Sequence, residues 1–135
     1  MHGNFSDDAR KIALSGPATG VDISNDGTRM AIAEFGRSRL FSVYSIETSS
    51  LEVSVEEPGC SCLGVVFGLN DQTLYALIDR EGESVELRVY SLHDKSAMLV
   101  QSYPYSDGAY SLRRAETASI AVLRHGVDIF AISPR

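Results

Sequence analysis

The feature that most constrains this chain is a pattern of residues that occurs three times. Ile23 in the first copy corresponds to Phe67 in the second, 44 positions further along the sequence. The segment at 43–46 (VYSI) recurs as VYSL at 89–92 and as IFAI at 129–132. A chain with such a repeat builds one supersecondary unit several times, and neighbouring units bury each other's apolar faces. The repeat therefore predicts the architecture before any local motif is considered.

Each copy has the pattern of β-strands rather than helices. Its apolar runs are short, rich in Val, Ile, Tyr, Phe and Leu, and bounded by Gly, Asn, Asp and Ser. Ser24–Thr28 (SNDGT) contains residues that tolerate positive φ and cap locally, so it predicts a hairpin turn. Leu69–Gln72 takes that place in the second copy and Ala115–Thr117, with poorer turn residues, in the third. A fourth strand is predicted at Lys11–Leu14, Leu51–Val55 and Ala97–Tyr103.

These repeats predict one all-β domain preceded by a short tail. The tail is expected at residues 1–10 and the domain at 11–133, with repeats at approximately 11–46, 51–92 and 97–132. Each repeat begins on the outermost strand of one four-stranded unit and ends on the third strand of the next. A length of 135 residues, with 44% apolar and 22% charged residues, is that of one soluble globular domain.

The repeat resembles the blades of the WD-repeat and YVTN-type β-propeller families. The resemblance is carried by Val21–Gly27 (VDISNDG), for the first strand and its turn, and by the three third-strand segments at 43–46, 89–92 and 129–132. Those three stand where the family often has an apolar-aromatic-Asp-Leu sequence. The chain has no Trp, no Gly-His dipeptide and no Asp at that position, so the Asp–His hydrogen-bond network of WD repeats is not expected. The resemblance covers roughly residues 11–132, implies blades of four antiparallel strands and does not choose between the two families.

About three blades fit into 135 residues, whereas closed propellers have about four to eight. Three blades alone leave two apolar faces open, and large apolar patches normally mark an interface. Three solutions stay open: two chains close a six-bladed ring by self-association, a different protein supplies the other blades, or the sequence is part of a longer propeller. A β-barrel or sandwich is the alternative fold, which fits the number of strands but does not explain the repeat.

Charge and hydropathy exclude several classes of partner. The net charge of −6 predicts no general attraction to nucleic acid or to anionic lipid. The longest apolar run, at 62–69, is interrupted by two glycines and is far shorter than the roughly 20 residues that span a bilayer. The first residues lack the apolar core of a signal peptide, so a cytoplasmic location is expected, with a nuclear one also open.

The sequence contains no catalytic or cofactor-binding motif. Neither G-x-S-x-G nor a phosphate-binding loop occurs, and no catalytic residue, metal ligand or cofactor is predicted. Cys60 and Cys62 are too close for an unstrained disulfide and lack further zinc ligands, so both are expected to be buried apolar residues. An enzymatic role is left undecided, although a non-enzymatic role is favoured.

The family resemblance places the candidate binding residues on one rim. In propellers the connections from the fourth strand to the next blade and from the second to the third strand share the rim near the axis where partners dock. Tyr and Arg are enriched in binding hot spots. The partner-binding residues predicted on this rim are Phe35, Arg37, Arg80, Tyr105, Arg124 and His125.

The sequence thus favours a scaffold that binds protein partners through these rim loops. The alternative is part of a propeller enzyme that resembles lactonases or quinone-dependent dehydrogenases, whose sites place carboxylates and His on the axial rim. Only Asp79, Glu81, Asp107 and His125 could serve there, and their spacing forms no motif. A third possibility is an architectural role, in which the chain completes a larger propeller.

Overall fold

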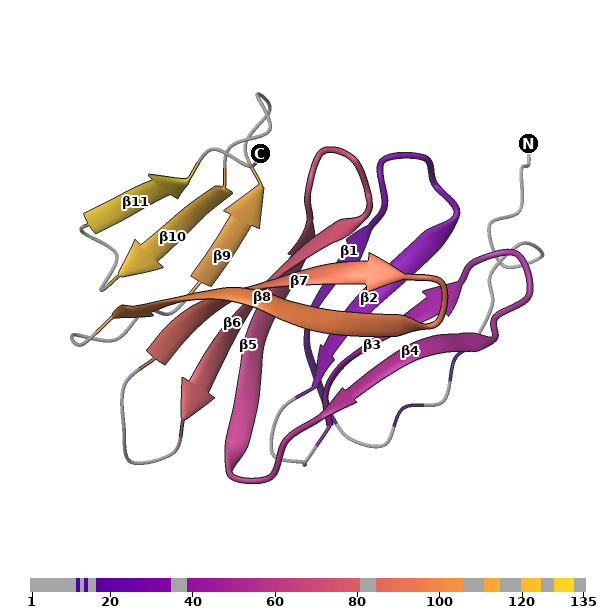
Figure 1. Cartoon of the computed structure of the whole chain (residues 1–135), viewed down its shortest axis with the longest axis horizontal. Helices are drawn as coiled ribbons and strands as arrows, with labels where there is room; N and C mark the ends of the chain where they lie inside the picture. Colours follow the sequence, from indigo (N-terminus) through magenta and orange to yellow (C-terminus); the bar gives the residue numbers. More distant parts are fainter. Residues whose placement is uncertain are drawn as a thin grey trace, which may run out of the picture.

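The computed structural model describes residues 12, 14, 17–34, 39–80, 85–105, 111–114, 120–124 and 128–132, with side chains described up to residue 104 and at Leu112. Within these ranges the chain forms eleven strands and no helix. The strands make three separate antiparallel sheets that lie side by side (Figure 1), named here the first, second and third blade. No helix of the described part is long and apolar enough to cross a membrane.

The first two blades each contain four strands in sequence order. The first blade consists of β1 (Ala18–Ile23), β2 (Arg29–Glu34), β3 (Arg39–Ser45) and β4 (Leu51–Glu56). The second consists of β5 (Cys60–Phe67), β6 (Thr73–Arg80), β7 (Val85–His93) and β8 (Ser96–Tyr105). The third has the order β11-β10-β9, from β9 (Ser111–Arg114), β10 (Ile120–Arg124) and β11 (Asp128–Ile132).

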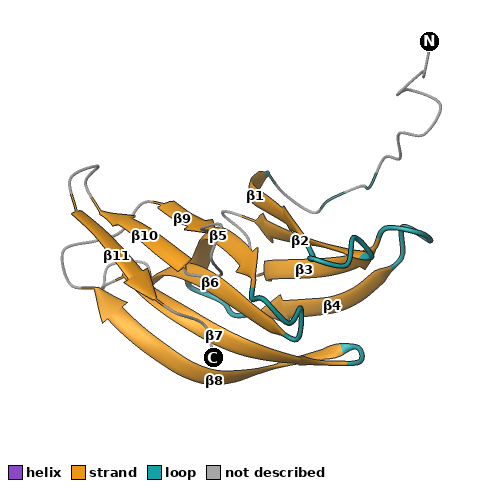
Figure 2. Cartoon of the chain, turned by 90° about the horizontal axis from the view of Figure 1, so that it is seen from above, coloured by secondary structure: helices purple, strands orange, loops and turns teal. Residues whose placement is uncertain are grey.

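The prediction of an all-β fold made of four-stranded antiparallel blades is confirmed. The described strands form three separate sheets, so the barrel or sandwich alternative is wrong. The fourth strands predicted at Leu51–Val55 and Ala97–Tyr103 are β4 and β8, each on the outer edge of its sheet (Figure 2). Ile12 and Leu14, in the segment predicted as a further such strand, lie outside the strands.

Two of the three predicted hairpin turns have matching hydrogen bonds. In the first, the Ser24 amide donates to the Arg29 carbonyl over 2.9 Å; in the second, the Gly68 amide donates to the Thr73 carbonyl over 2.7 Å. Each of these two turns contains one residue with positive φ: Gly27, at 75°, in the first and Asp71, at 61°, in the second. Asp tolerates this left-handed region better than most residues, which explains why the second turn forms without glycine. The third predicted turn, at 115–117, lies outside the described residues.

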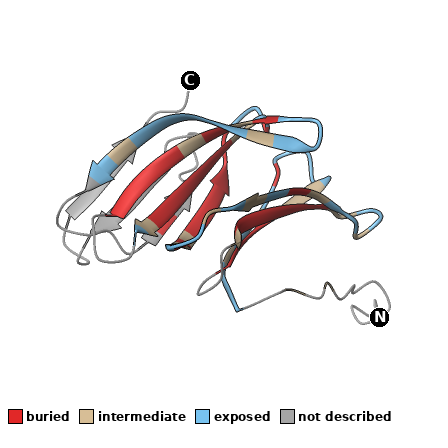
Figure 3. Ribbon diagram, turned by 60° about the horizontal axis from the view of Figure 1, so that its bottom comes forward, coloured by how far each residue is buried: buried red, intermediate tan, exposed pale blue. Residues whose placement is uncertain are grey.

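The largest hydrophobic core lies between the first and second blades. Phe41 and Val43 of β3 belong to the same buried cluster as Phe67 of β5 and Leu74 of β6. A second cluster, between the second and third blades, contains Leu77 of β6 together with Leu87 and Leu112. The second blade is therefore covered on both faces (Figure 3), which is why β6 is apolar at successive positions instead of alternating.

The two cysteines are free thiols inside the first core. Burial raises the pKa of Cys62 to about 12 and also raises that of Cys60. Both thiols therefore stay protonated at neutral pH and act as small apolar side chains, which confirms the prediction for this pair.

Candidate partner-binding rim

The structure brings two of the six predicted binding residues to one edge of the second blade. Arg80 ends β6 and pairs with Cys60, the first residue of β5; Tyr105 ends β8 and pairs with Val85, the first residue of β7. Arg124 ends β10 in the third blade, and the arrowheads of β6 and β10 point the same way (Figure 1). This edge of the second blade, together with the connection at 57–59, is called the rim below.

The remaining predicted residues cannot be placed on the rim. Phe35, Arg37 and His125 lie outside the described residues, as do the side chains of Tyr105 and Arg124. Of the four residues considered for an enzyme site, Asp79 lies in β6, and the other three lie outside the described residues. Within the described part, no three His, Cys, Asp or Glu residues gather as metal ligands.

Beneath the rim lies a buried guanidinium that the sequence analysis did not single out. Arg88 of β7 is buried, and its Nη1 and Nη2 atoms donate to the two carboxylate oxygens of Glu57 over 2.9 and 3.0 Å. Glu57 stands in the connection from β4 to β5, 31 positions earlier in the chain. This two-pronged geometry is the strong form of an Arg–carboxylate pair and fixes the orientation of both groups.

The same guanidinium is held from two further sides. Its Nε donates to Glu86 over 2.5 Å, and its Nη1 also donates to the hydroxyl of Tyr90 over 3.1 Å. Ser102 of β8 donates to the other oxygen of Glu86 over 3.1 Å, and Arg80 lies 3.9 Å from that oxygen. The network therefore runs from the interior of the second blade out to Arg80, whose side chain is 45% exposed.

The positive charge of Arg88 is neutralised by direct hydrogen bonds to the carboxylates of Glu57 and Glu86. The hydrogen bonds from Arg88 lower the pKa of Glu57 to about 2. Burial acts to lower the pKa of Arg88, but the hydrogen bonds to its partners outweigh it and raise that pKa. The thiol of Cys60 donates to Glu57 over 3.1 Å. The connection at 57–59 is thus anchored by an ion pair that stays charged throughout the physiological range.

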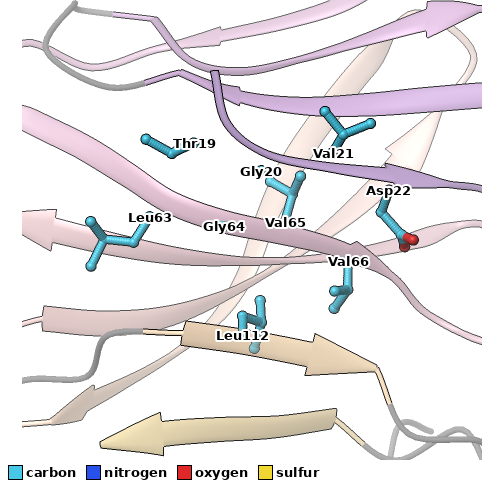
Figure 4. A pocket seen from close by; sticks show the side chains of 9 residues that line it. All are labelled: Thr19, Gly20, Val21, Asp22, Leu63, Gly64, Val65, Val66 and Leu112. Atoms are coloured by element: carbon cyan, nitrogen blue, oxygen red, sulfur yellow. The ribbon is translucent and has the colours of Figure 1, made fainter. Parts of the chain in front are cut away.

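A cavity of about 290 Å³ lies away from this network, along the inner strands of the three blades (Figure 4). It is lined by residues of β1 and β5 and by Leu112 of β9. Among the described residues that line it, the one carboxylate is Asp22, which accepts a hydrogen bond from the Phe67 amide over 2.7 Å. The other lining residues described are Thr19, Gly20, Gly64 and apolar residues such as Val21, Leu63 and Leu112.

The comparisons with known proteins concern the fold alone. No family model matches the sequence, and no curated protein sequence matches it. The C-terminal WD40 domain of Sif2 superposes with a TM-score of 0.65 at 12% identity, covering 91% of this chain and 36% of that one. The Dos1 propeller superposes with a TM-score of 0.60 at 12% identity, covering 83% of this chain and 29% of that one. Hydrazine synthase of Kuenenia stuttgartiensis superposes with a TM-score of 0.68 at 18% identity, covering 84% of this chain and 33% of that one.

The fold is therefore of the β-propeller type, with blades arranged as in WD-repeat structures. The chain spans about a third of the length of the solved chains that it matches. The described sheets do not close into a ring.

Proposed function

We propose that the chain is a non-enzymatic scaffold that binds a protein partner through the rim of the second blade. The observation that supports it most is the network under that rim. A side chain that is already held in place loses little conformational entropy when a partner binds, so a preorganised surface binds more tightly than a mobile one. Arg80 is such a side chain, since it is partly exposed and lies near the fixed carboxylate of Glu86.

The partner that this rim fits is a protein surface rather than a polyanion. The rim presents Arg80 together with Glu57, whose side chain is 40% exposed, so both signs of charge lie within one small area. Such mixed polar surfaces with an Arg anchor are typical of protein interfaces, where charge complementarity sets specificity. A net charge of −6 argues against a nucleic acid.

The test compares partners recovered from cell extract by the wild-type chain and by variants. Arg80→Ala and Tyr105→Ala alter the rim, whereas Lys95→Ala alters an exposed cation in the β7–β8 turn, at the opposite end of the sheet. We expect a protein that wild type and Lys95→Ala recover and that both rim variants lose. Its binding to the purified chain would then be measured by calorimetry. Recovery by all four chains alike, or by none, would contradict the proposal.

A further inference from the structure

The outermost strand of the second blade is exposed along almost its whole length. β8 pairs with β7 on one side, and among the described strands none pairs with its other edge (Figure 2). Met98, Leu99 and Val100 are 57%, 47% and 53% exposed, although all three are apolar. The strands that lie next to one another between blades are the inner ones, β1, β5 and β9. The open edge of β8 therefore lies on the outside of the blades.

This edge lacks the charges that normally protect a strand from pairing with another chain. Exposed edges in natural proteins carry charged residues, prolines or bulges that discourage such pairing. β4, the corresponding edge of the first blade, has Glu52 and Glu56, whereas the ten residues of β8 include no charged side chain. β8 does have a bulge at Val100 and a proline at Pro104. Both lie in its second half, so the part of the strand before Val100 is unprotected.

The register of the sheet shows which backbone groups the unprotected part presents. The Leu92 amide of β7 donates to the carbonyl of the residue just before β6. Backbone groups alternate in direction along a strand, so those of Ser91 point to β8, where Ser91 pairs with Met98. The N–H and C=O groups of Ala97 and Leu99, on either side of Met98, therefore point away from the sheet. They present two donors and two acceptors with the spacing of an antiparallel ladder.

The side chains of this part are apolar on both faces of the strand. Ala97 packs against the core between the first two blades, so Leu99, two positions later, lies on the same face. Met98 and Val100 lie on the other face. The occupant that fits this edge is therefore an extended strand that is uncharged, apolar on both faces and able to offer two donors and two acceptors in return.

β8 itself meets this description, and we propose that the β8 edges of two copies of the chain pair antiparallel about a two-fold axis. When the Met98 residues of the two copies face each other, Ala97 of each copy pairs with Leu99 of the other, and each copy donates two backbone hydrogen bonds. No like charges meet in this pairing, whereas pairing through β4 would bring glutamates together. A two-fold contact uses the same surface on both copies and closes as a dimer.

The test is the mass of the full chain in solution, measured by light scattering after size-exclusion chromatography over a wide range of concentrations. Met98→Lys and Met98→Glu each place two like charges opposite each other at the two-fold axis. The side chain is 57% exposed, so the fold should tolerate both changes. We expect wild type to reach twice the mass of the chain and each variant to keep the mass of one chain. An equimolar mixture of the two variants should form the dimer again, because opposite charges then face each other.

Leu51→Lys is the matched control. Leu51 pairs with Tyr44 as Leu99 pairs with Tyr90, and it is 44% exposed, so this change should leave the dimer intact. The proposal is overturned by a wild type that is monomeric at every concentration, by variants that stay dimeric, by a control that dissociates or by a mixture of folded variants that stays monomeric.

If circular dichroism shows that the Met98 variants are unfolded, hydrogen exchange of the wild type decides. Protection of the Ala97 and Leu99 amides should rise with concentration, and no rise overturns the proposal. Partner recovery by the rim is a separate measurement and does not depend on this outcome.

Discussion

The side-chain amide of Asn25, in the first turn of the first blade, donates to the carboxylate of Asp71, in the first turn of the second blade, over 2.7 Å. The backbone amides of Asn25 and Asp26 donate to the same carboxylate over 2.7 and 2.9 Å. Arg29 donates to the backbone carbonyl of Asp71. One carboxylate thus holds the neighbouring turn by three hydrogen bonds, so the two blades are joined at this end by polar contacts as well as by the core.

Replacing Asp71 should loosen the joint between the blades. Asp71→Ala removes the carboxylate that accepts three hydrogen bonds. It also puts alanine at a positive φ, a left-handed conformation that costs alanine more than aspartate, whose side chain can form local hydrogen bonds. The donors stand on the exposed residues Asn25 and Asp26, where water can replace the carboxylate, so each lost hydrogen bond costs about 0.5–1.5 kcal/mol. We expect the free energy of unfolding, from urea denaturation, to fall by about 2–4 kcal/mol in total.

The matched control is Asn70→Ala, one residue earlier. Asn70 is exposed and accepts from the Gln72 amide within its own turn over 3.0 Å, so it does not reach the first blade in this way. Its loss should cost less than about 1 kcal/mol. Equal losses for the two variants would mean that the turn itself, and not the contact between blades, is what Asp71 stabilises.

Much of the fold could be predicted from the sequence because it depends on local patterns. The turn at 24–28 contains its own signal, and the repeat gives the number of strands in each blade. The bond from Asn25 to Asp71 could not be predicted, since it requires the relative placement of two blades. The sequence does contain a partial signal. The repeat aligns Asp71 with Gly27, so the second turn has a carboxylate at the position of positive φ where the first turn has glycine.

The candidate site was predicted less completely than the fold. The family resemblance predicts Arg80 and Tyr105 on one rim, and both end strands at the same edge of the second blade. Arg88 and Glu86 alternate within an apolar strand, which is a visible signal of a buried ion pair. The partner Glu57, however, is 31 residues away and could be assigned only once the sheet was built.

Stability should fall in acid through the titration of Glu57. Its pKa is about 2 in the folded chain against 4.5 for the free group, so the folded state favours the charged form. The stabilisation is therefore fully present above about pH 4.5 and is lost as the pH falls toward about 2. Because the side chain is 40% exposed, solvent screening makes the loss smaller than the shift alone implies.

Glu57→Gln isolates this contribution. Asp26 also has a pKa lowered to about 2, by hydrogen bonds from Thr28 and Ser24, and titrates in the same window. The urea midpoint should therefore still depend on pH in the variant, but less steeply than in wild type. Identical slopes between pH 5 and 2 would show that the Glu57–Arg88 pair does not contribute to folding.

Removing the buried guanidinium should cost more than removing a surface charge. Arg88→Met fills a similar volume but leaves Glu86, itself buried, without its nearest cation. Breaking a buried pair from one side costs about 3–5 kcal/mol, because the remaining charge stays desolvated. Arg88→Met combined with Glu86→Gln should recover part of that loss. If the double variant is as unstable as the sum of the two single variants, the groups are not energetically coupled.

Gly68, which follows β5, is required because a side chain has no space there, and not because of its φ angle. A β-carbon built there would lie 3.1 Å from the Cβ atom of Thr73 and 3.3 Å from a ring carbon of Tyr75. Thr73 belongs to β6 and pairs in the ladder, so it can move little. Gly68→Ala should therefore lower the free energy of unfolding by about 1–3 kcal/mol, the usual cost of overpacking. Gly20→Ala is the control, because its nearest contact, with Gly64, is 3.4 Å and within ordinary packing distance. Both variants would be compared with wild type by thermal unfolding. A smaller decrease in stability for Gly68→Ala than for Gly20→Ala would contradict the prediction, because the second hairpin would then accommodate the extra methyl group more easily than the contact between the inner strands.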